Sequence, residues 1–128
     1  MSCARWSAPA LADNVPHLRQ AVVDFACVNG VSESVVVDVR LAISEALTNA
    51  ILHAYHRYAQ PGSVRVSASI EREWIELRVA DDGSGFAPRD DSPGLGLGIP
   101  LINRLADQVE LRRRPDVGGT EVRMRFRL

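Results

Sequence analysis

At 128 residues, the chain has the length of one domain and can bury roughly two-thirds of its unfolded surface, enough for a core without disulfide bonds. Hydrophobic residues make up 46% and charged residues 24%, and the net charge of −1 indicates neither a nucleic-acid nor a membrane surface. The N-terminus lacks a long apolar segment, so we expect no signal peptide, no membrane span and a reducing cytoplasmic location without a disulfide.

The first half of the chain predicts a short strand followed by two helices. A weak strand pattern covers residues 4–8, and apolar residues then recur at three- and four-residue steps over about 14–29. Cys27 falls in this first helical pattern, where we expect it to be a small core residue. A second helix is predicted over about 32–58, with an apolar stripe typical of a core-facing helix.

A second strip follows the same long helix at four-residue steps. It consists of Leu41, Glu45, Asn49 and His53, so it carries a carboxylate, an amide and an imidazole. Side chains four residues apart lie on one helical face, which would bring these groups together. The spacing alone favours an ordinary solvated face over a functional one.

The second half alternates apolar and polar residues, which is typical of strands with one buried face. Residues 64–70 and 75–79 predict a hairpin, and a short helix is expected to start at Ile99 with Pro100 in its first turn. A strand beginning at 109, a turn over 112–119 and a final strand over 122–128 complete the chain. This order predicts an α/β two-layer sandwich, a mostly antiparallel sheet with helices on one face.

Two glycine-rich segments lie close together between these elements. Asp81-Asp82-Gly83-Ser84-Gly85 directly follows an apolar strand, and Gly94-Leu95-Gly96-Leu97-Gly98 precedes the short helix. Glycine is dense where the backbone needs positive φ or where another group must approach it closely. From the glycines alone, a nucleotide site and a pair of ordinary surface turns remain equally open.

Four motifs together resemble the Bergerat-type ATP-binding fold of gyrase, heat-shock chaperones, histidine kinases and mismatch-repair ATPases. Residues 44–55 look like the family's N box, and the two glycine-rich segments look like its first and second glycine boxes. Gly118-Gly119-Thr120 looks like the last box, just before the final strand. Within this superfamily, the sequence most resembles the anti-sigma-factor serine/threonine kinases. The resemblance implies one histidine-kinase-like ATPase domain over residues 1–128.

The resemblance implies roles for individual residues. Asn49 resembles the amide that ligates Mg²⁺, and Glu45 resembles the general base that takes a proton from the substrate hydroxyl. Asp81 resembles the carboxylate that accepts a hydrogen bond from the adenine amino group, and Thr120 the hydroxyl that supports it. His53 also matches a family position, but a core or helix-end histidine explains it equally well.

The resemblance also implies that the glycines of both boxes bring the protein backbone close to the nucleotide. Gly83 and Gly85 would let the base and ribose lie against the chain. The second box would present amides to the phosphates at the start of the helix, through Gly94, Gly96, Leu97 and Gly98. ATP and Mg²⁺ are the cofactors that this implies.

Proteins of this kind bind a sigma factor and phosphorylate a serine of a small STAS-like anti-anti-sigma partner, and they are commonly dimers. The resemblance therefore implies an ATP-dependent serine/threonine kinase that acts by partner switching. One departure concerns the short acidic loop 86–93, where relatives often have a basic residue at the position of Pro93. This leaves open an ATP-gated binding module with little or no kinase activity. A degenerate domain that binds no nucleotide is a third possibility, against which the intact Asp81 and Asn49 count.

Overall fold

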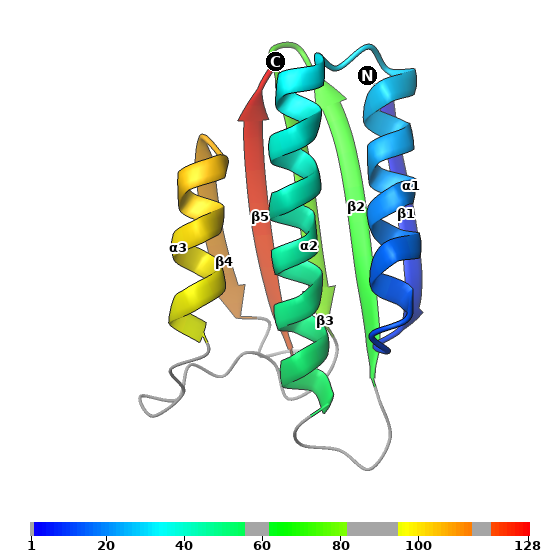
Figure 1. Cartoon of the computed structure of the whole chain (residues 1–128), viewed down its shortest axis with the longest axis vertical. Helices are drawn as coiled ribbons and strands as arrows, with labels where there is room; N and C mark the ends of the chain where they lie inside the picture. Colours follow the sequence, from blue (N-terminus) through cyan, green and yellow to red (C-terminus); the bar gives the residue numbers. More distant parts are fainter. Residues whose placement is uncertain (1, 56–61, 82–94, 114–118) are drawn as a thin grey trace.

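The computed structural model describes residues 2–55, 62–81, 95–113 and 119–128 (Figure 1). Within these ranges the elements follow the predicted order of strands and helices. They are β1 (Ser2–Pro9), α1 (Asn14–Val28), α2 (Glu33–Tyr55), β2 (Ser63–Glu71), β3 (Trp74–Asp81), α3 (Leu95–Leu105), β4 (Gln108–Arg113) and β5 (Thr120–Arg127). None of the helices in the described ranges is long and apolar enough to cross a membrane.

The five strands form one sheet in the order β1-β2-β3-β5-β4, and every neighbouring pair is antiparallel. All three helices cover the same face of this sheet, with α2 in the middle between α1 and α3 (Figure 1). The predicted α/β two-layer sandwich with an antiparallel sheet is confirmed. The face turned away from the helices is called the outer face below.

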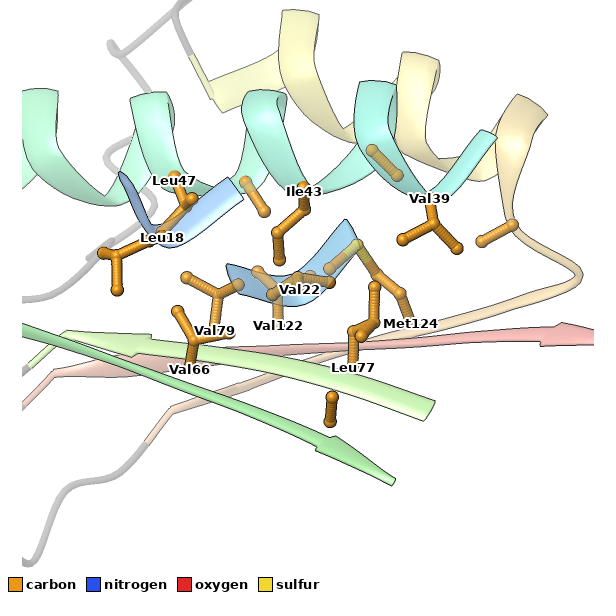
Figure 2. Packing of buried hydrophobic residues seen from close by; sticks show 14 of the residues in the cluster. Leu18, Val22, Val39, Ile43, Leu47, Val66, Leu77, Val79, Val122 and Met124 are labelled. Carbon is orange, nitrogen blue, oxygen red and sulfur yellow. The ribbon is translucent and has the colours of Figure 1, made fainter. Parts of the chain in front are cut away.

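The core fills the space between the helices and the inner face of the sheet. Because strand side chains alternate between faces, β3 and β5 each send every second residue inward, as the burial pattern of both strands shows. Figure 2 shows these side chains meeting those of α1 and α2. Full burial of each large aliphatic side chain contributes about 1.5–3 kcal/mol. The fully buried ones include Val39, Ile43, Leu47, Ile75, Leu77 and Met124.

Helix α1 corrects one prediction about its buried face. Cys27 was expected in the core, but its side chain is exposed, and Ala26 beside it is completely buried. Consecutive residues of an α-helix point about 100° apart, so the residue after a core position faces a different way. The core face of α1 runs through Leu18, Val22 and Val23 to Ala26.

Helix α3 also differs from its prediction. It begins at Leu95, four residues before the expected start at Ile99, so Pro100 lies inside the helix. Gly96 and Gly98 therefore have helical backbone and are not part of a turn. Glycine in a helix costs up to about 1 kcal/mol, but tertiary packing, here against α2, outweighs such propensities. Strand β4 likewise continues through Arg113, two residues into the segment predicted as a turn.

Candidate functional site

Two buried polar residues stand at neighbouring strand ends. Asp81 is the last residue of β3 and Thr120 is the first residue of β5. Their neighbours Ala80 and Glu121 are directly opposed in the antiparallel ladder. This register places Asp81 and Thr120 next to each other. The side chains of Asp81 and Thr120 are 0% and 1% exposed, respectively. A buried carboxylate and a buried hydroxyl thus lie at neighbouring strand ends, at one end of the sheet.

Gly119 fixes the close approach of these two strand ends. Its φ of +96° lies in the region that favours glycine, and a Cβ added there would lie 2.0 Å from the carbonyl oxygen of Asp81. The same Cβ would be 3.3 Å from the carboxylate oxygen Oδ1 of Asp81. Only glycine lets the chain enter β5 directly against Asp81, so the absence of a side chain at 119 leaves room beside that carboxylate.

Two buried polar atoms near this end have no hydrogen-bond partner among the described residues. They are Nδ2 of Asn49, in a side chain 9% exposed, and Oγ1 of Thr120. Leaving a buried donor or acceptor unsatisfied costs about 1–3 kcal/mol, and most buried polar groups in folded proteins are paired. Polar atoms held in this way are suited to a ligand that supplies the missing partners.

Helix α2 carries the polar strip predicted from the four-residue spacing. Asn49 is buried and Glu45, one turn earlier, is half-buried, so this part of the strip is not a fully solvated face. Leu41 at the start of the strip is 49% exposed. Glu45 makes no hydrogen bond or ion pair with any described residue, which leaves its carboxylate available to a substrate. The structure describes the backbone of His53 but not its side chain.

The start of α3 lies at the same end of the molecule as the end of β3 and the start of β5, the lower end in Figure 1. The end of α2 lies there as well. The first four amides of a helix have no intrahelical acceptor, and at α3 these belong to residues 95–98. Gly96, Leu97 and Gly98 are therefore backbone donors at this end, although they form helix and not turn. Gly83, Gly85, Gly94 and the loop 86–93 lie outside the described residues.

The oxygen donors available at this end of the molecule suit one magnesium ion that is held mainly by the phosphates of a ligand. Among the described residues, no three of the His, Cys, Asp and Glu side chains form a cluster that could hold a metal ion by themselves. Mg²⁺ prefers oxygen donors and usually takes one or two from the protein, the rest coming from phosphates and water. The carboxamide of Asn49, whose buried nitrogen lacks a partner, offers such an oxygen. The residues present therefore fit a magnesium nucleotide.

The sequence motifs assign no individual role to Gly119. It was part of the Gly118-Gly119-Thr120 motif, but no individual role followed from that resemblance. Its signal in the sequence is a pair of glycines immediately before an alternating strand pattern, which indicates a close backbone approach. The sequence could not say which group approaches it, because that group is Asp81, far away along the chain.

Comparisons with known proteins agree with this geometry. Residues 8–126 match the family described as histidine kinase-like ATPase domain. The chain is 29% identical over 117 residues to the anti-sigma F factor of Pasteuria penetrans, covering 83% of this chain and 78% of that protein. It is 31% identical over 119 residues to the serine-protein kinase RsbW of Bacillus licheniformis, covering 81% and 74%.

A solved structure shows the same fold. It contains the RsbU and RsbW domains of a Mycobacterium tuberculosis protein, and it matches with a TM-score of 0.78 at 20% sequence identity. All of this chain is covered, but only 32% of that longer chain. The histidine kinase domain of the Erythrobacter litoralis blue-light activated histidine kinase matches with a TM-score of 0.56 at 19% identity, covering 92% and 60%.

Proposed function

Because the chain belongs to the histidine kinase-like ATPase domain family, we propose that it is an ATP-dependent serine/threonine kinase that also acts as an anti-sigma factor. Its substrate would be a serine of a small anti-anti-sigma protein of the STAS type, and its second partner a sigma factor. Exchange between these partners would regulate transcription in the cytoplasm. Relatives named anti-sigma F factor and serine-protein kinase RsbW support both halves of this proposal.

The observation that carries the proposal is the buried carboxylate of Asp81, held against Gly119 and beside the unpartnered hydroxyl of Thr120. Asp81 would accept a hydrogen bond from the amino group of adenine, with the Thr120 hydroxyl supporting the same contact. Guanine has a carbonyl at the corresponding position, which would face the carboxylate and be repelled. The pocket would therefore select ATP over GTP.

The phosphates would be held between α2 and the start of α3. The free amides of residues 95–98 are suited to phosphate oxygens, and the helix dipole adds to this attraction. The side-chain oxygen of Asn49 would ligate the magnesium ion. When bound, Mg²⁺ neutralises charge that develops on the transferring phosphoryl group. The chain contains no lysine, so any cationic support for the phosphates would come from arginine.

Glu45 would act as the general base. It lies one helical turn before Asn49 on α2, is half-buried, and has no hydrogen-bond partner in the described part of the chain. Its carboxylate would accept the proton of the substrate serine hydroxyl as the oxygen attacks the γ-phosphorus. Such a base contributes about 10²–10⁴-fold to the rate.

A second candidate is an ATP-gated binding module with little or no kinase activity. The sequence of the loop 86–93 favours it, because Pro93 occupies the position at which a basic residue would meet the phosphates. The carboxylate of Glu45, which has no partner among the described residues, favours the kinase, because a module that only binds nucleotide has no use for a base at this point.

Transfer of radiolabelled phosphate from ATP to candidate anti-anti-sigma proteins separates the two functions. We expect Glu45→Gln to bind ATP as the wild type does and to lose transfer by about 100-fold or more. Glu33→Gln makes the same chemical change in the first turn of α2 and should transfer phosphate normally. Persistent transfer by Glu45→Gln would exclude Glu45 as the base. A wild type that binds ATP but labels no candidate protein would favour the binding module.

A further inference from the structure

The outer face of the sheet is charged, and in one half of it arginines form ion pairs with glutamates. On β3, β5 and β4, arginines pair with glutamates at 2.7–3.8 Å between nitrogen and oxygen, although Arg78 and Arg123 are directly opposed in the ladder. Glu76 contacts three arginines and Glu110 contacts two. The paired arginines of this half are Arg78, Arg112, Arg123 and Arg125.

The other half, on β1 and β2, carries two arginines that have no partner among the described residues. Arg5 and Arg65 are exposed on the outer face, and neither makes a hydrogen bond or an ion pair with any described residue. In the antiparallel register Arg5 lies opposite Ser67, and Arg65 lies opposite Ser7. The two arginines are therefore diagonal neighbours, within about 7–8 Å at their Cβ atoms.

A shallow groove lies between these arginines, and its cavity volume is about 480 Å³. Its lining includes the small side chains of Ser7 and Ser67 and the three arginines Arg5, Arg65 and Arg78. Glu121 at the edge is 3.5 Å from the guanidinium of Arg78 and lies on the far side from Arg5 and Arg65. This outer groove thus offers two hydroxyls and two unpaired guanidinium groups to a ligand.

An ordinary solvated face explains this arrangement less well than a binding site. Neighbouring like charges on a sheet cost a few tenths of a kcal/mol or more. In the β3–β5–β4 half, Arg78 and Arg123 are directly opposed, but both pair with Glu76, which offsets this cost. The sequence supplies no such glutamate beside Arg5 and Arg65 in the described part of β1 and β2. The repulsion is removed when a ligand brings the negative charges.

We propose that the outer groove binds an acidic segment of a protein partner. Its carboxylates would pair with Arg5 and Arg65, since the guanidinium fork matches a carboxylate in bidentate geometry. The hydroxyls of Ser7 and Ser67 would donate further hydrogen bonds. The groove lies on the face opposite the helices, so this contact is separate from the proposed ATP site and does not depend on it.

The chemistry of the groove favours a peptide over a nucleic acid. Single-stranded nucleic acid binds by stacking on open aromatic faces. Trp6 beside the groove packs edge-on against Phe25 of α1, with ring centres 6.2 Å apart. Trp74, elsewhere on the outer face, is covered by Arg125 and Arg127. A second copy docked groove to groove would bring like charges together, so it does not complement this site either.

Binding of a fluorescein-labelled octaglutamate peptide to the full chain, followed by fluorescence anisotropy at about 0.1 M salt, tests the proposal. We expect Arg5→Ala/Arg65→Ala to weaken binding about tenfold or more, since hydrogen bonds to charged groups are lost. Arg40→Ala/Arg104→Ala removes the same charge from exposed positions on α2 and α3 and should change the affinity less than about twofold.

Ser67→Tyr places a large side chain in the groove without changing the charge. The fold should tolerate it, because an aromatic side chain suits a half-exposed strand position. We expect it to reduce peptide binding as strongly as the double arginine variant. Absence of wild-type binding, equal losses in both double variants, or full binding by Ser67→Tyr would overturn the proposal. So would tighter binding of a labelled oligothymidylate. A dimer in sedimentation velocity that Ser67→Tyr dissociates would identify the groove as an interface between copies and would also overturn it.

Discussion

At the residue scale, the candidate site is marked by two buried polar atoms without hydrogen-bond partners among the described residues and by one glycine without a side chain. Asn49 and Thr120 each bury a polar atom that has no partner among the described residues. Gly119 has no side chain where any Cβ would meet the Asp81 carbonyl oxygen. The motifs predicted Asn49, Asp81 and Thr120 as a set, but the close contact of Gly119 with Asp81 could not be predicted, because it joins residues from two strands.

Replacing Gly119 by alanine tests this contact. Gly119→Ala must both adopt an unfavourable positive φ and displace the Asp81 carbonyl, so we expect a loss of unfolding free energy of about 2 kcal/mol or more. ATP affinity should fall at least about tenfold as the pocket opens. Urea unfolding and nucleotide titration measure the two effects.

Gly30→Ala is the matched control. Gly30 also has a positive φ, of +77°, but nothing lies within 4 Å of an added Cβ. It should lose only about 1–2 kcal/mol, the cost of the left-handed conformation, and should keep its ATP affinity. If the two variants lose stability and affinity equally, the contact of Gly119 with Asp81 has no special role.

At the scale of elements, the alternation of the strands predicted the sheet well, since one face is buried and the other is solvated. Strand β1 extends over Ser2–Pro9, beyond the weak pattern at 4–8, because pairing with β2 orders the ends of the strand. Helix α3 was predicted to start too late, since three nearby glycines suggested a turn and Pro100 suits the first turn of a helix. Helix propensity is a local property, and contacts with α2 outweigh it here.

Pro100→Ala tests where α3 begins. With the helix starting at Leu95, Pro100 lacks the amide that would donate to the Gly96 carbonyl, so alanine should raise the unfolding free energy by about 1–3 kcal/mol. Asn103→Ala, an exposed position in the same helix, should gain only about 0.5 kcal/mol or less. Urea unfolding measures both. Unchanged stability in Pro100→Ala would indicate a first-turn proline, as the sequence alone suggested.

At the scale of the whole molecule, the two layers separate two kinds of surface. The proposed nucleotide site lies at one end, where the ends of α2 and β3 meet the starts of α3 and β5 (Figure 1). The outer groove lies on the far face of the sheet, across β1 and β2. A ligand at the proposed nucleotide site would contact several elements at once, and it would stabilise the entire fold if it binds only the folded state.

MgATP should accordingly raise the melting temperature. At a concentration 100 times its dissociation constant, a ligand that binds only the folded state stabilises it by about 2.7 kcal/mol. For a chain of this size that corresponds to roughly 10 °C. Asp81→Asn, measured against its own ligand-free melting temperature, should lose most of this shift, and GTP should give little shift with the wild type. No shift at millimolar MgATP would contradict ATP binding.

The sequence by itself determined the order and type of the elements, the two-layer sandwich and the positions of Glu45, Asn49, Asp81 and Thr120 in recognisable motifs. The elements follow from periodicity and spacing, which are local along the chain, and the motif positions follow from the resemblance to a known family. Only the tertiary structure decided the exposure of Cys27, the start of α3, the contact of Gly119 with Asp81 and the unpaired arginines of the outer groove. Each of these depends on strand register or helix packing, because the groups that meet are distant in sequence.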